Sequence, residues 1–359
     1  MTLRPTTVQE LQEAIPTQER WLPRGGGSKP ALSTPRAGQA VLDMTGLRGV
    51  LEYDPGEFVL VAQAGTPLIE VEGLLAQHGQ YLPFDPPFVE AGATLGGTVA
   101  AGLSGPLRQR YGGVRDFILG VKFVDGEGNL IKGGGKVVKN AAGFDLPKLM
   151  VGSLGRLGVL TEVAFKVFPF PKATVTLRVS LGSLEEAIQT LYALACSPFE
   201  FYTLDLEPSP ARLILRVGGL GQALPLRIER ILGFLGTSRA VERLEGEPER
   251  QYWREIGQLQ WGAGHLVKVP ITAKQISALE ARLPMGERRY LSAGNLLYLR
   301  WPGEIAQLDQ LLRSQGLSGL VLGGGEAAHL ESPRIGVDCS QAFGHRVTQA
   351  LDPLSRFAP

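Results

Sequence analysis

Glycine is the feature that most constrains this chain, because many of its 47 glycines are crowded into short segments. In the first half they gather in residues 24–28, 92–113, 126–135 and 143–158. Glycine is needed where the backbone takes a positive φ or closely approaches another group. A tight hairpin turn explains one such cluster, but four clusters predict that backbone lies against a bound molecule.

The rest of the composition is that of an ordinary globular protein. The chain has 359 residues, of which 44% are hydrophobic and 20% charged, enough for two domains with their own cores. A formal net charge of +1 gives no reason to expect a nucleic-acid partner. No apolar run is long enough to span a membrane, and residues 1–15 lack the core of a signal peptide. We therefore expect a cytoplasmic protein.

Cysteine and histidine usage argues against a metal site. The two cysteines, Cys196 and Cys339, exclude a four-cysteine cluster or zinc site within this chain, and we expect them to be buried free thiols. The four histidines are His78, His265, His329 and His345. No two of them stand three or four residues apart, so a metal site built from them would need long-range assembly. The fingerprints of Rossmann dinucleotide-binding, Walker A and GxSxG proteins are also absent.

Strand-like and helix-like patterns alternate along the chain. In the first part, strands are predicted at 41–44, 49–54, 58–65, 117–125 and 130–134, and helices at 6–15, 67–78 and about 94–104. After residues 168–171 (FPFP) glycine becomes rarer, and a β-α-β-β-α-β order predicts a ferredoxin-like sheet. We expect domains at 1–170 and 171–330, and a final segment at 331–359.

Three glycine-rich segments carry the chemistry. Residues 23–29 (PRGGGSK) expose successive backbone N–H groups that suit a phosphate, although a simple turn explains this segment equally well. Residues 84–128 contain a run of small residues against which a flat ring or a pyrophosphate can lie, or which can pack as a helix in a tight core. Residues 133–171 place glycines beside a long strand whose backbone can pair with the edge of a ring.

The order of these segments resembles the FAD-binding domain of the vanillyl-alcohol-oxidase, or PCMH-type, superfamily. The finer resemblance is to the glycolate oxidase E-subunit family, through GATLGGTVAAGLSGP (92–106), VRDFILG (114–120) and KNAAGFDLPKLMVGSLGRLGVLTE (139–162). The strong match covers about residues 20–170. The resemblance implies an α+β fold: a two-subdomain PCMH-type FAD-binding domain, then a ferredoxin-like cap, then a C-terminal LDPLSRFAP segment that returns to the FAD-binding domain.

The resemblance also implies a set of FAD-binding residues. Those at the pyrophosphate would be Arg24, Gly25, Gly26, Gly27 and Ser28, continued by Thr94, Gly96, Gly97, Gly102 and Ser104. Those nearer the flavin would be Tyr111, Gly112, Gly158, Val159 and Leu160, while Asp85 and Pro86 match the family's DP step. No histidine or cysteine is placed for covalent attachment, so the FAD is expected to be non-covalent.

Two departures from related 2-hydroxy-acid dehydrogenases bear on the reaction. Leu154 stands in GSLGRLG where those enzymes carry a glutamate in GSEGTLG, and their C-terminal His/Asp/Asn/His cluster has no counterpart here. No catalytic residue is therefore assigned.

Three functions remain open. The first is an FAD-binding subunit of a complex that oxidises glycolate to glyoxylate, with a catalytic flavoprotein partner and an iron–sulfur partner. Such a subunit would be cytoplasmic, or would lie at the inner membrane through its partners. The second is a self-sufficient FAD dehydrogenase of a small alcohol or 2-hydroxy acid, with His265 or Lys268 as the base, although an ordinary solvated lysine is the simpler interpretation. The third is a non-catalytic structural subunit.

Overall fold

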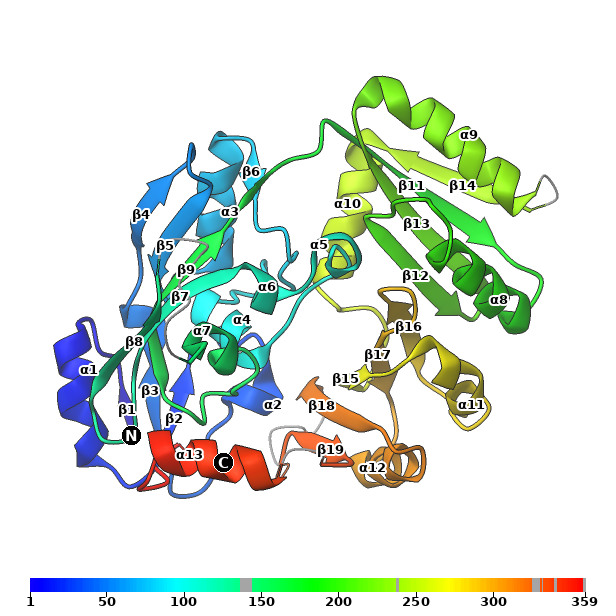
Figure 1. Cartoon of the computed structure of the whole chain (residues 1–359). Coiled ribbons are helices and arrows are strands. Elements are labelled where there is room, and N and C mark those ends of the chain that lie inside the picture. Colours follow the sequence, from blue (N-terminus) through cyan, green and yellow to red (C-terminus); the bar gives the residue numbers. More distant parts are fainter. Residues whose placement is uncertain (136–143, 237–238, 325–329, 331, 339–340, 358–359) are drawn as a thin grey trace.

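The computed structural model describes residues 1–135, 144–236, 239–324, 330, 332–338 and 341–357. Figure 1 shows two α+β parts side by side, which we call the N-terminal part (residues 1–169) and the C-terminal part (residues 173–336). Residues 170–172 connect them. No helix in the described ranges is both long and apolar enough to cross a membrane.

The N-terminal part begins with a small parallel sheet. Its order is β1-β3-β2, from β1 (Thr2–Leu3), β3 (Ala40–Asp43) and β2 (Trp21–Arg24). Helix α1 (Val8–Ala14) starts where the Thr7 hydroxyl accepts a hydrogen bond from the Glu10 amide at 3.1 Å. Trp21 is almost fully buried and donates its indole N–H to the Ile15 carbonyl at 3.1 Å. These contacts fix β2, whose last residue leads directly into the glycine loop.

An antiparallel sheet of order β4-β5-β9-β7-β8 forms the centre of the N-terminal part. Its strands are β4 (Val50–Asp54), β5 (Val59–Gln63), β9 (Val159–Lys166), β7 (Ile118–Val124) and β8 (Leu130–Gly134). The central β9 is buried on both faces, as its near-continuous apolar sequence requires. The remaining elements are α2 (Pro30–Ser33), α3 (Leu68–Gln77), α4 (Leu95–Ala101), α5 (Arg108–Tyr111), α6 (Val114–Phe117), α7 (Leu146–Met150) and the paired strands β6 (Gln80–Tyr81) and β10 (Phe168–Pro169).

The first half of the C-terminal part confirms the ferredoxin-like prediction. It runs β11 (Ala173–Ser180), α8 (Leu184–Ala195), β12 (Thr203–Pro208), β13 (Ala211–Gly219), α9 (Leu224–Leu235) and β14 (Val241–Glu245). The spatial order of its strands is β14-β11-β13-β12, which places the fourth strand beside the first. Both long helices lie on the same face of the sheet, where they contribute to one apolar core.

A second β-α-β-β-α-β unit follows, which the sequence pattern alone did not predict. Helix α10 (Gly246–Gly257) leads into β15 (His265–Pro270), α11 (Ile276–Glu280), β16 (Glu287–Leu291), β17 (Leu296–Trp301), α12 (Ile305–Ser314) and β18 (Ser318–Gly323). Its strand order is β16-β17-β15-β18, so the two units repeat one topology. They join where β12 meets β16, and β19 (Arg334–Gly336) adds to β18, giving a nine-stranded sheet in the described part of the chain.

Strand alternation determines what the second unit presents to the N-terminal part. Val267 and Val269 face the helices of the C-terminal core, while Leu266, which precedes Val267 on the strand, joins the core of the N-terminal part. On β17, Leu297 and Leu299 face the helices and Tyr298 faces the N-terminal part. The outer face of this sheet is therefore the wall against which the N-terminal part packs.

The end of the chain contacts the N-terminal part. Figure 1 shows α13 (Gln341–Leu351) running from β19 back beneath the N-terminal strands. The Trp21 amide donates to the Arg356 carbonyl at 2.7 Å, and the Gly126 amide donates to the Leu351 carbonyl at 2.9 Å. Phe357, only 3% exposed, fills the core around α1.

Two expectations from the sequence need correction. The strand predicted from residue 117 begins at 118, because residues 114–117 form the short helix α6. Cys196 is exposed rather than buried, since it caps the C-terminal end of α8 at the surface. Cys339, His329 and residues 136–143 of the third glycine-rich segment lie outside the described residues.

Candidate cofactor site

The first glycine segment forms a loop between β2 and α2. It runs through residues 25–29, and Gly27 takes a φ of +71°, which favours glycine. The Ser33 hydroxyl donates to the Lys29 carbonyl at 2.7 Å, which closes the loop on the first turn of α2. The loop therefore has a fixed backbone path at the end of a strand, with few side chains to cover its amides.

The second glycine segment approaches this loop so closely that side chains are excluded. A Cβ atom on Gly26 would lie 1.7 Å from the Gly92 carbonyl oxygen, and one on Gly25 would lie 2.3 Å from the Thr94 hydroxyl oxygen. Thr94 in turn accepts a hydrogen bond from the Gly97 amide at 3.2 Å and caps α4. Two of the three glycines in the first loop are thus explained by its contact with the second segment.

The third segment closes the same site from the end of β9. Leu154 has a φ of +56°, and its amide donates to the Ala100 carbonyl at 2.8 Å, which holds the turn against the end of α4. Gly158 takes a φ of +139°, and a Cβ there would lie 2.7 Å from the Phe123 ring. These constraints place the start of β9 beside α4.

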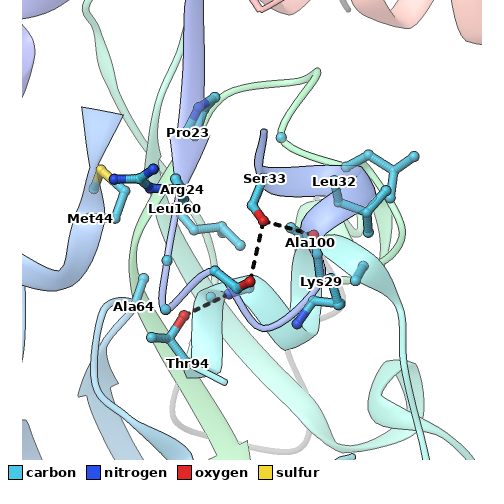
Figure 2. A pocket seen from close by; sticks show the side chains of 18 of the residues that line it. Pro23, Arg24, Lys29, Leu32, Ser33, Met44, Ala64, Thr94, Ala100 and Leu160 are labelled. Carbon is cyan, nitrogen blue, oxygen red and sulfur yellow. Dashed lines mark hydrogen bonds between the residues drawn. The ribbon is translucent and has the colours of Figure 1, made fainter. Parts of the chain in front are cut away.

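The three segments together line one pocket, shown in Figure 2. Predicted residues on its wall are Arg24, Gly25, Gly26, Gly27, Ser28, Thr94, Gly96, Gly97, Gly158, Val159 and Leu160. Other residues on the wall are Pro23, Lys29, Leu32, Ser33, Met44, Ala64, Ala100, Ala101, Leu154 and Gly155. Most of the predicted residues are therefore brought together, and backbone supplies much of the wall.

Lys29 is the one of these additional residues that carries a charge. It is only 7% exposed, and its Nζ donates to the Ser28 hydroxyl at 2.8 Å. Nζ also lies 5.5 Å from the centre of the Phe88 ring. Burial lowers the pKa of Lys29 to about 8. The signal in the sequence was its position directly after PRGGGS, but its contact with Phe88 joins residues that are distant along the chain.

Gly102 and Ser104 lie at the boundary between the two parts of the molecule instead. Gly102 ends α4 with a φ of +60°, and its carbonyl accepts a 2.8 Å hydrogen bond from Nζ of Lys268 on β15. Burial lowers the pKa of Lys268 to about 8. Ser104 lines a second, smaller pocket together with Tyr298 of β17, whose buried hydroxyl has no hydrogen-bond partner among the described residues.

The other predicted residues lie outside the main pocket. Asp85 has a φ of +52° and packs against Gly105, and burial raises the pKa of its carboxyl group. Pro86, which follows it, is buried. Tyr111 joins an aromatic cluster in which its ring lies 5.6 Å from that of Tyr202, and Gly112 ends α5 with a φ of +96°. These residues lie at or near the contact between the two parts.

The described residues contain no group of three or more metal-binding side chains. The pocket has instead the features that suit a dinucleotide with a pyrophosphate: a loop of exposed amides, a flat wall of small residues and a buried ammonium group. Gly27 leaves room above the backbone, since a Cβ there would meet no atom within 4 Å. The residues present therefore fit FAD, the cofactor expected from the sequence.

Comparison with known proteins agrees with this fit. The FAD binding domain family matches residues 1–134. Among solved structures, alkyldihydroxyacetonephosphate synthase superposes with a TM-score of 0.71 at 16% identity, covering 100% of this chain and 76% of that one. At that identity the likeness shows the fold alone, which is the PCMH-type fold.

Relatives of known function extend the comparison beyond the cofactor. The glycolate oxidase subunit GlcD of Bacillus subtilis is 30% identical over 195 residues, 54% of this chain and 41% of its own length. The glycolate oxidase subunit GlcE of Escherichia coli K12 is 36% identical over 363 residues, which cover 98% of this chain and 95% of that subunit. The cofactor is FAD, and the chain belongs to the family of the glycolate oxidase subunit GlcE.

Proposed function

We propose that this chain is the FAD-binding subunit of a complex that oxidises a small 2-hydroxy acid, with glycolate converted to glyoxylate. The observation that carries the proposal is the pocket in which three glycine-rich segments and a buried lysine meet, in a member of the GlcE family. FAD supplies the electron-accepting chemistry when bound. The predicted binding residues, including those at the boundary such as Gly102 and Ser104, remain part of this proposal.

The chain's own residues bind and orient the cofactor. The close contact of Gly26 with Gly92 fixes the loop, so that its amides are held in place before the cofactor arrives. Gly96 packs against Ala64, where a Cβ would lie 2.8 Å from the alanine methyl group, and this keeps α4 flat against the sheet. The C-terminal part contacts the end of α4 through the hydrogen bond from Lys268 to the Gly102 carbonyl.

The proposal includes partner subunits, a catalytic flavoprotein and an iron–sulfur protein. Oxidation of a 2-hydroxy acid needs a cation to hold its carboxylate and a base to take the hydroxyl proton. Two cysteines in the whole chain are too few for a four-cysteine iron–sulfur relay. We place the assembly in the cytoplasm or at the inner membrane through its partners, and we retain the division into residues 1–170, 171–330 and 331–359.

Two experiments test the proposal. Acid precipitation of the purified chain should release the yellow colour into the supernatant, because no covalent link is expected, and flavin left in the pellet would contradict that. Steady-state oxidation of glycolate should then be measured for the chain alone and for the chain with its co-purified partners. The proposal expects activity only with partners, and a chain that takes up no FAD would reject it outright.

A self-sufficient dehydrogenase is the second candidate, and Lys268 is the observation in its favour. Its ammonium group reaches from the C-terminal part to the N-terminal part, and burial lowers its pKa to about 8, near the range useful for a base. Replacement of Lys268 by methionine separates the two candidates. If the isolated unaltered chain oxidises a hydroxy acid and the Lys268→Met variant does not, the second function is favoured. If the isolated unaltered chain is already inactive, the second function is not supported.

A further inference from the structure

Lys29 is a buried cation without a neighbouring anion among the described residues. The residue is only 7% exposed and lies on the wall of the cofactor pocket. Among the described residues no carboxylate forms an ion pair with it, and its only hydrogen-bond acceptor is the Ser28 hydroxyl. Two other lysines show the contrast: Lys122 forms an ion pair with Glu162 at 2.7 Å, and Lys148 forms one with Asp145 at 2.6 Å.

An ammonium group in this position is costly for the chain alone. Transfer of a charge out of water is unfavourable unless an opposite charge or several hydrogen bonds replace the water. The Phe88 ring at 5.5 Å offers a cation–π contact, which returns only a small part of that cost. A buried cation that the fold does not neutralise indicates an anionic ligand at the same place.

The surroundings of Lys29 specify which anion. Its hydroxyl neighbour Ser28 belongs to the glycine loop, and Gly27 beside it leaves open space above the backbone. In Figure 2, Lys29, Leu32 and Ser33 line one side of the pocket, with Arg24 and Met44 on the other. A compact, strongly hydrated ammonium group suits a phosphate oxygen, to which it acts as a point charge.

We propose that Lys29, together with the Ser28 hydroxyl, binds the pyrophosphate of FAD and makes the site selective for the dinucleotide over neutral flavins. This inference rests on the proposed function, in which the pocket holds FAD. Lys29 was not among the residues expected from the family resemblance. Its role is to neutralise the pyrophosphate, while the loop amides give that group its orientation.

The test compares three ligands on apoprotein carrying Lys29→Met, which keeps the length of the side chain and removes the charge. Dissociation constants for FAD, ADP and riboflavin are measured by fluorescence or calorimetry. A charge-assisted hydrogen bond predicts FAD and ADP affinities about 10- to 100-fold weaker, with riboflavin changed by less than about threefold. Lys274→Met, the same change at an exposed position, should leave all three unaltered.

The thermal stability of the same proteins gives a second readout. Without ligand, Lys29→Met should melt at a higher temperature than the unaltered chain, because the unpaired charge is gone. With saturating FAD this advantage of the variant should shrink, because the variant binds FAD more weakly. A lysine with a purely structural role would lower the melting temperature in both states when it is replaced.

Two outcomes of the affinity measurements overturn the inference. Unchanged FAD and ADP affinities in Lys29→Met would remove Lys29 from the pyrophosphate. Riboflavin weakened as much as FAD would place the ammonium group at the flavin ring. If Lys29→Met does not fold, Lys29→Gln takes its place with the same expected ligand pattern. Failure of the unaltered chain to bind FAD at all would instead reject the proposed function, so the two failures are distinguishable.

Discussion

The pocket and the boundary between the two parts are built in different ways. The pocket is made largely of backbone, and its glycines are fixed by contacts such as that of Gly26 with the Gly92 carbonyl. The boundary is made of side chains from distant strands, among them Lys268 and Tyr298, with polar atoms that are only partly satisfied. The pocket is thus preorganised by backbone contacts, whereas the boundary depends on individual side chains.

The difference implies different responses to mutation. A site built from backbone fails when a single Cβ is added, because the loops would have to move apart and would lose their packing contacts. A side-chain boundary tolerates the loss of one polar group, especially of one that lacks a partner. The predictions below test this contrast, beginning with the largest expected effect.

Gly26→Ala should abolish FAD binding and destabilise the chain. The added Cβ would lie 1.7 Å from the Gly92 carbonyl oxygen, which is backbone and cannot turn aside. We expect a cost of about 3 kcal/mol or more in the free energy of unfolding. Urea denaturation and FAD titration check this, with Gly73→Ala as the control, since a Cβ there meets no atom within 4 Å. A normal affinity in Gly26→Ala would show that the two loops are not interlocked.

Gly97→Asp should weaken FAD binding while leaving the fold intact. Gly97 lines the pocket, and its Cβ would meet only the Thr94 hydroxyl, at 3.1 Å. A carboxylate near the pyrophosphate costs on the order of 1–4 kcal/mol at about 4 Å. The matched control is Gly97→Asn, which has the same shape without the charge. Equal affinities for the Asp and Asn variants would exclude a phosphate from this side of the pocket.

The stability of the apoprotein should depend on pH through Lys29. Burial lowers its pKa to about 8 from the ordinary 10.5, so between these pH values the unfolded chain binds more protons than the folded one. Stability should therefore rise with pH across this range, by up to about 3 kcal/mol. Because Lys268 shifts in the same direction, the measurement compares denaturation of the unaltered chain with that of Lys29→Met. Identical pH profiles would show that Lys29 is protonated equally in both states.

Tyr298→Phe should have the smallest effect on the isolated chain. The change removes a buried hydroxyl without a partner in the described structure, so the free energy of unfolding should stay within about 1 kcal/mol or increase slightly. A melting curve tests this. A loss of several kcal/mol would mean that the hydroxyl is hydrogen-bonded within the chain and that this boundary does not tolerate the loss of one polar group.

The sequence predicted the pocket better than it predicted the boundary, and the physical reason is locality. The glycines at 25–27 and 96–97 signal a backbone constraint that stays visible in a short stretch of chain. The contact of Lys29 with the Phe88 ring joins distant residues, and the contact of Lys268 with Gly102 spans 166 residues, so neither can be derived from a local pattern.

Local pattern also explains which of the two β-α-β-β-α-β units could be predicted from the sequence. The first β-α-β-β-α-β unit has long strands such as Ala211–Gly219, and its order was predicted. The second has short strands and the five-residue helix Ile276–Glu280, so only its topology reveals the repeat. Exposure of Cys196 depends on where α8 ends, which composition does not determine.

Anaerobic stopped-flow reduction tests the central claim, that this chain is an FAD-binding subunit dependent on partners, most directly. The FAD-loaded chain is mixed with millimolar glycolate or D-lactate, first alone and then with its co-purified partners, and bleaching of the flavin absorbance is followed. The account predicts negligible bleaching by the chain alone and rapid bleaching in the assembly. Bleaching at rates on the order of tens per second by the chain alone, within the usual range of enzyme turnover, would contradict it and establish a self-sufficient dehydrogenase.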